Sequence, residues 1–149
     1  MRIRSQIVCA ALATLALAAS VPASAQGESR FGIWDNESNA NNVMTYEAYG
    51  KGGMKITVDN PSKPGTAWSY VTMFDGQFRP VEGQEGSETA VEIIDARSTR
   101  ISNKRNGVVY QVVINTLSED GKKINNEYIR MDPAGKITGV THVTYIRRK

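Results

Sequence analysis

Apolar and polar side chains alternate along most of the chain after residue 30, and this period of two constrains the fold more than any other feature. Met54, Ile56 and Val58 are apolar, and a polar residue follows each of them. Successive side chains of a strand point to opposite faces, so this alternation indicates a strand with one buried face. Similar runs, rich in β-branched and aromatic residues, occur at 68–74, 91–93, 99–101, 108–117, 123–131 and 137–147.

The runs are separated by short turn signals. Asn106-Gly107 suits a type I′ hairpin, because both central residues of that turn need positive φ. Asp75-Gly76 and residues 132–135 are further tight-turn sequences. Strands joined by short turns run antiparallel, and a long sheet curls until closure removes its edges. We therefore predict one all-β domain over residues 31–149, an antiparallel up-and-down barrel or strongly curled half-barrel of about eight to nine strands. A β-sandwich is the alternative.

Residues 1–25 have the pattern of a cleavable secretory signal peptide. Arg2 and Arg4 precede an uncharged apolar run at 7–19, and Ala23 and Ala25 supply the small side chains that signal peptidase requires. As a helix, the apolar run would span about 20 Å, against roughly 30 Å of membrane hydrocarbon, so it does not predict a transmembrane anchor. We expect a signal helix, cleavage before Gln26, a short polar leader at 26–30 and a periplasmic or secreted product.

Removing the signal would change the chemistry available to the chain. Cys9 is the only cysteine and lies within the apolar run, so the processed chain would have no disulfide, thiol nucleophile or thiolate metal site. The formal charge of +3 would fall to about +1 with the loss of two arginines. Lys104-Arg105 and the basic tail at 147–149 are typical of solvated charge. The sequence therefore predicts no nucleic-acid binding.

A Gly-x-Trp sequence opens the first strand, within Phe31-Gly32-Ile33-Trp34. It resembles the first motif of the lipocalins, in which the Trp plugs one end of the barrel and an Arg of the last strand packs over it. The resemblance implies that Gly32 and Trp34 form the plug, with Arg147 or Arg148 as its cover. Over most of residues 31–131 the chain also resembles small secreted lipocalin-like proteins of Gram-negative bacteria, whose functions are largely unassigned. The stretches that carry this resemblance are 45–47, 54–59, 68–70, 74–76 and 102–104.

Candidate catalytic and metal-binding groups lack suitable neighbours in the sequence. His142, the only histidine, is interpreted as a surface or barrel-mouth residue, because a triad or zinc site needs partners. Residues 35–39 begin like a calcium loop but lack its central Gly and closing Glu. The sequence predicts no catalytic residue, no metal and no cofactor, and a protein that is not an enzyme. Four acidic residues are interpreted as a solvated loop rather than as acid–base machinery: Glu82, Glu85, Glu88 and Glu92.

Aromatic residues are the strongest candidates for a binding site. Trp68, Tyr70 and Phe74 share one face of a predicted strand, and Tyr110 and Tyr128 lie on neighbouring strands. Inward-facing residues of a barrel either fill its centre or line a cavity. Our leading hypothesis is a small, mostly apolar ligand bound by these five residues. The alternative is a filled barrel that serves as a structural or interaction module with a protein partner in the cell envelope. The sequence leaves open which faces of 108–117 and 137–147 point inward.

Overall fold

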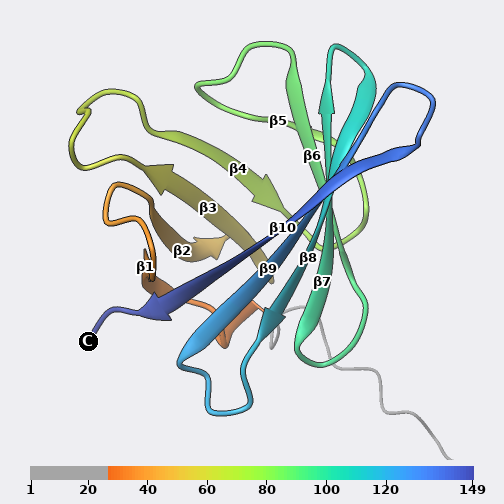
Figure 1. Cartoon of the computed structure of the whole chain (residues 1–149). Coiled ribbons are helices and arrows are strands. Elements are labelled where there is room, and N and C mark those ends of the chain that lie inside the picture. The colour runs from red at the N-terminus through yellow and green to blue at the C-terminus, as the bar shows by residue number, and fades with distance from the viewer. Residues whose placement is uncertain (1–26) are drawn as a thin grey trace, which may run out of the picture.

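The computed structural model describes residues 27–149, which form one antiparallel sheet of ten strands (Figure 1). The predicted all-β antiparallel fold is confirmed, and the expected strand count was too low. The strands missed are β2, whose C-terminal half is exposed without alternation, and β5, which has two residues and includes Pro80. The predicted signal helix and cleavage site lie outside the described residues. The strands are β1 (Gly32–Asn36), β2 (Val43–Tyr49), β3 (Gly53–Asp59), β4 (Trp68–Thr72), β5 (Arg79–Pro80), β6 (Ser87–Ile93), β7 (Ser98–Arg105), β8 (Val108–Leu117), β9 (Lys123–Met131) and β10 (Ile137–Arg147).

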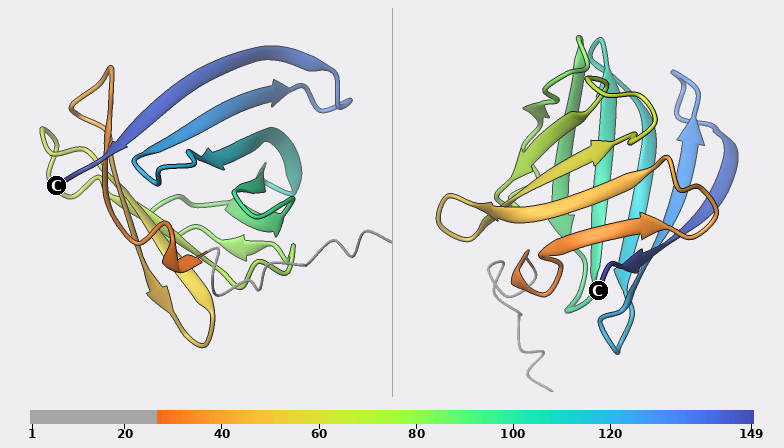
Figure 2. Two further views of the ribbon diagram at one scale, coloured as in Figure 1. Left: turned by 90° about the horizontal axis from the view of Figure 1, so that it is seen from below. Right: turned by 90° about the vertical axis from the view of Figure 1, so that its left-hand side faces the viewer.

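The sheet curls into a nearly closed barrel. Its strand order is β4-β3-β2-β1-β10-β9-β8-β7-β6-β5, so β1 pairs with both β2 and β10, and β4 and β5 meet at a seam. Two backbone hydrogen bonds cross near the seam, from Ser69 N to Glu82 O at 3.0 Å and from Glu82 N to Ser69 O at 2.8 Å. A further bridge joins Asp75 and Glu92. Figure 2 shows the strands wrapping around a common interior.

Trp34 and Arg147 close one end of the barrel. Trp34 is fully buried, and its indole N–H donates to the carbonyl oxygen of Arg30 at 2.9 Å. The Arg147 guanidinium lies 4.2 Å from the Trp34 ring centroid and donates to the carbonyl oxygens of Phe31 and Ser29. Arg148 instead pairs with Asp35. Of the two arginines suggested by the lipocalin resemblance, Arg147 is therefore the one that covers the tryptophan.

Gly32 has a structural role beside this pair. Its φ is +129°, a conformation that favours glycine, and a Cβ there would lie 3.3 Å from the Arg147 side chain. Glycine thus permits both the entry of the chain into β1 and the close approach of Arg147. Gly32 and Trp34 thus both lie beside the Arg147 side chain, Gly32 by leaving room for it and Trp34 by packing against it.

The structure settles which faces of the two ambiguous strands point inward. In β8, Val113, Asn115 and Leu117 are buried, and in β10 Tyr145 is. The register of β7 and β8 shifts between Asn103 and Lys104, which leaves Tyr110 without a paired residue. A β-bulge of this kind re-aims side chains, and sequence alternation fails to predict the inward face where it occurs. Within residues 27–149, no helix is both long and apolar enough to cross a membrane.

Candidate functional site

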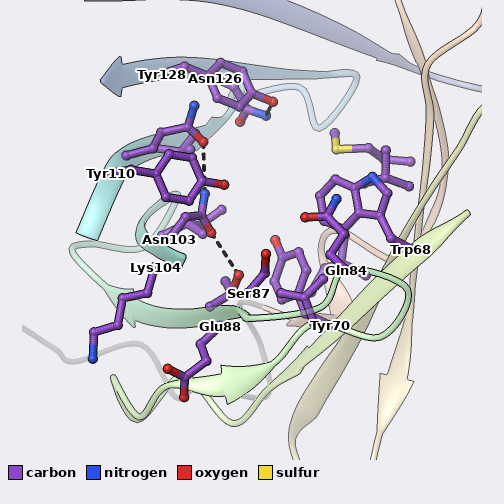
Figure 3. Close-up of a pocket in the computed structure, with 18 of the residues that line it drawn as sticks. Trp68, Tyr70, Gln84, Ser87, Glu88, Asn103, Lys104, Tyr110, Asn126 and Tyr128 are labelled. Carbon is purple, nitrogen blue, oxygen red and sulfur yellow. Dashed lines mark hydrogen bonds between the residues drawn. The ribbon is translucent and has the colours of Figure 1, made fainter. Parts of the chain in front are cut away.

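The barrel contains a cavity of about 330 Å³. It lies toward the end of the barrel where the β7–β8 turn and the loop before β6 are found, away from Trp34, which does not line it. The inward-facing side chains of eight strands contribute to its wall, because alternate residues of each strand point inside. Figure 3 shows the space between Trp68 and Tyr70 of β4 and the side chains of β6 to β9. The interior is therefore open rather than filled with side chains.

One wall of the cavity is apolar and aromatic. It consists of side chains from β2, β3 and β4, including Met44, Ile56 and Val58. The rings of Trp68 and Tyr70 stack beside them, with centroids 6.2 Å apart and planes 20° from parallel. Burial raises the pKa of the Tyr70 hydroxyl well above its usual value, so that group stays neutral. This wall offers an apolar ligand a large surface without charge.

The facing wall is polar and internally hydrogen-bonded. Thr89 of β6 donates to the side-chain oxygen of Asn103 of β7 at 2.8 Å, and the Asn103 amide donates to Gln111 of β8 at 3.0 Å. Three charged residues stand at the rim. Lys104 lies 3.6 Å from the Phe78 ring centroid, Arg105 lies 5.4 Å from that of Tyr110, and Glu88 extends away from the centre in Figure 3.

Two polar atoms of the cavity lining are buried without a hydrogen-bond partner. They are the hydroxyl oxygen of Ser87 and the side-chain oxygen of Asn42. Leaving a buried polar group unsatisfied costs about 1–3 kcal/mol, so buried groups of this kind normally have a hydrogen-bond partner. A molecule with a polar group, or ordered water, would provide one.

A buried arginine lies close to residues of the cavity lining, among them Tyr46, Ile56 and Tyr70. Arg30 is 1 % exposed, donates to Asn115 at 3.0 Å and to the carbonyl oxygen of Arg97 at 2.6 Å, and burial lowers its guanidinium pKa. Arg30 falls in the stretch 26–30, which was predicted to be a short polar leader, so its buried role was not predicted. Residues 27–30 have no periodic pattern that could have revealed it, although its proximity to Trp34 in the sequence was a weak signal.

The structure brings four of the five predicted ligand-binding residues together. Trp68, Tyr70, Tyr110 and Tyr128 all line the cavity. Phe74 does not, because β4 ends at Thr72 and the backbone of Phe74 has a φ of +58°. The Phe74 ring is buried next to Gly27, outside the cavity lining.

The titratable candidates are dispersed. His142 is on the outer face of β10, with an exposed side chain and a 3.9 Å approach to Glu127. Glu92 pairs with Arg100, Glu82 accepts a hydrogen bond from Ser69, and Glu85 is exposed. Glu88 lines the cavity rim, which the prediction of a solvated loop did not anticipate. No group of three or more His, Cys, Asp or Glu residues that could hold a metal ion is present in the described part of the chain.

Residues 27–149 thus form an antiparallel, nearly closed barrel with an internal cavity, an architecture that lipocalins also have. The chain is similar in structure to a point mutant of the fluorescent protein UnaG, with a TM-score of 0.58 and 11 % sequence identity, over 82 % of this chain and 98 % of the other. This likeness shows the fold. No protein-family model and no curated protein matches the sequence.

Proposed function

We propose that the protein binds a small, mostly apolar molecule inside the barrel. The open cavity of about 330 Å³ carries this proposal, since a volume of that size matches pockets that bury a drug-sized ligand. Its aromatic wall at Trp68 and Tyr70 supplies apolar surface, and its polar wall supplies orientation. The alternative, a filled structural module of the cell envelope, predicts an interior without such a space, and the cavity disfavours it. We also propose that the protein is not an enzyme and acts on its ligand by binding alone.

A neutral fluorescent probe tests this function. N-phenyl-1-naphthylamine is apolar, fluoresces more strongly outside water, and should bind with one-to-one stoichiometry and a dissociation constant of about 1–100 µM. Titration of the protein while probe emission is recorded gives both values. Linear, non-saturating emission would contradict the proposal. Mass spectrometry of the protein purified from its native source under non-denaturing conditions should also detect a co-purified small molecule.

We further propose that the protein is exported and that the signal is removed after Ala25. Replacement of Ala25 with a bulky residue such as Phe should block processing, because signal peptidase accepts small side chains at this position. The intact mass of the Ala25→Phe variant should then correspond to a chain that still contains residues 1–25. The intact mass of the unaltered protein should correspond to a chain that begins at Gln26. This part of the proposal would be wrong if the unaltered protein were found in the cytoplasmic fraction with residues 1–25 still attached.

A further inference from the structure

A chain of side-chain hydrogen bonds runs from the closed end of the barrel to the cavity. Arg30 donates to Asn115 at 3.0 Å, the Asn115 amide donates to Asn126 at 2.8 Å, and the Asn126 amide donates to the Tyr128 hydroxyl at 3.1 Å. Asn115 and Asn126 are almost fully buried, at 1 % and 4 % exposed. Tyr128 lines the cavity at the end of this chain.

The direction of every bond in the chain follows from its first member. A guanidinium only donates, so the oxygen of Asn115 must face Arg30 and its NH₂ group must face away. That NH₂ group requires the oxygen of Asn126, which in turn directs the NH₂ group of Asn126 to the hydroxyl oxygen of Tyr128. The Tyr128 oxygen is therefore the acceptor of the hydrogen bond from Asn126.

The hydroxyl hydrogen of Tyr128 is not used in this chain. The Tyr128 oxygen accepts a hydrogen from Asn126, and no bond of the chain takes the hydrogen that Tyr128 itself carries. Because Tyr128 lines the cavity, that hydrogen is available to an acceptor inside it.

We propose that Tyr128 donates this hydrogen to an acceptor oxygen of the bound molecule, and that an anionic oxygen is preferred. This inference rests on the proposed function and specifies the chemical class of the ligand as an apolar body with an anionic or carbonyl oxygen. Tyr128 lies on β9, across the interior from the apolar wall of Trp68 and Tyr70, so one molecule can contact both (Figure 3).

The charges around the cavity support an anionic acceptor. Arg30 lies at the start of the chain, and hydrogen bonds in series polarise one another, so its positive charge strengthens Tyr128 as a donor. At the rim, Lys104 and Arg105 line the cavity together with one acidic residue, Glu88. The lining residues therefore attract an anion more than they repel it.

Two probes that share an aromatic body and differ in one anionic group test this proposal. N-phenyl-1-naphthylamine is neutral, and 8-anilino-1-naphthalenesulfonate adds a sulfonate to the same rings. We expect Tyr128→Phe to lower the ratio of sulfonate affinity to neutral-probe affinity about tenfold, because the variant removes one charge-assisted hydrogen bond. The loss should persist in high salt, which screens Lys104 and Arg105 at the rim but not a buried hydrogen bond.

A second variant tests the role of the chain itself. Asn115→Leu breaks the link between Arg30 and Asn126 without adding a charge and without changing a residue of the cavity lining, and it should lower the same ratio because the Asn126 amide is no longer held as a donor to Tyr128. Tyr49→Phe, on an exposed side chain of β2, is the control and should leave the ratio unchanged. Thermal unfolding of each variant verifies folding, and the neutral probe reports an accessible cavity.

The outcomes separate this inference from the proposed function. If the neutral probe binds the unaltered protein but Tyr128→Phe changes the affinity ratio by less than twofold, the assignment of Tyr128 is wrong and the binding function stands. If neither probe binds the unaltered protein, both proposals fail. A tenfold fall in the ratio with Tyr128→Phe, but none with Asn115→Leu, would retain Tyr128 as donor and overturn the role of the chain from Arg30.

Discussion

Replacing Trp34 with alanine is expected to lower the free energy of unfolding by about 3–5 kcal/mol, the range for removing a large buried aromatic side chain. Trp34 is fully buried, packs edge-on against Tyr46 at 6.4 Å between ring centroids, and lies beneath the Arg147 guanidinium. Its indole N–H also satisfies the carbonyl oxygen of Arg30. Chemical denaturation followed by circular dichroism measures the loss.

The second tryptophan of the chain provides a matched comparison. Trp68 is half-buried and lines the cavity, so Trp68→Ala removes surface that faces open space rather than a packed core. We expect a smaller loss of stability than for Trp34→Ala, together with weaker binding of the neutral probe. Equal destabilisation by the two substitutions would show that Trp34 does not have the closing role assigned to it.

Filling the cavity should abolish binding. Val113 of β8 is 3 % exposed and lines the cavity, and tryptophan at this position would occupy space that a ligand needs. We expect Val113→Trp to weaken neutral-probe binding at least about tenfold, which corresponds to roughly 1.4 kcal/mol or more. The open space should limit the cost of overpacking to about 1–3 kcal/mol of stability. Probe titration and thermal unfolding measure the two effects.

The adjacent residue of the same strand is the control for this experiment. Val112 points to the outer face of the sheet and is absent from the cavity lining, so Val112→Trp adds the same side chain on the other side of the barrel wall. Probe binding should be retained in this variant. Loss of binding in Val112→Trp alone would place the probe on the outer surface and contradict an internal site.

The sequence was sufficient for the class of fold. The alternation of apolar and polar residues in strands such as Gly53–Asp59 indicates which face of the strand is buried. A turn sequence such as Asn106-Gly107 indicates that the two strands beside it form a hairpin. Both are local properties, so they are visible without a structure. The Gly32–Trp34 spacing indicated the plug by resemblance. Of the four cavity-lining aromatics, Trp68 and Tyr70 were identified from the strand face that they share, and Tyr110 and Tyr128 from their place on neighbouring strands.

Other features depended on contacts between distant parts of the chain. Arg30 is buried because its guanidinium reaches Asn115 and the backbone of Arg97, 85 and 67 residues away, and no local pattern reports such partners. The choice of Arg147 over Arg148 as the cover of Trp34 depended on the register of β1 and β10. Phe74 was misplaced because alternation assumes that the strand continues, whereas β4 ends at Thr72.

The period of two and the turn residues by themselves determined that this chain forms an antiparallel all-β domain, because strand direction and hairpin geometry are set by neighbouring residues. The open interior was decided by the tertiary structure. Inward side chains either meet at the centre of the barrel or leave a space there. The outcome depends on the number of strands in the barrel and on the direction that the bulge in β8 gives to the Tyr110 side chain. The hydrogen-bond chain from Arg30 to Tyr128 likewise exists only after β8 and β9 have paired and Arg30 has packed against them.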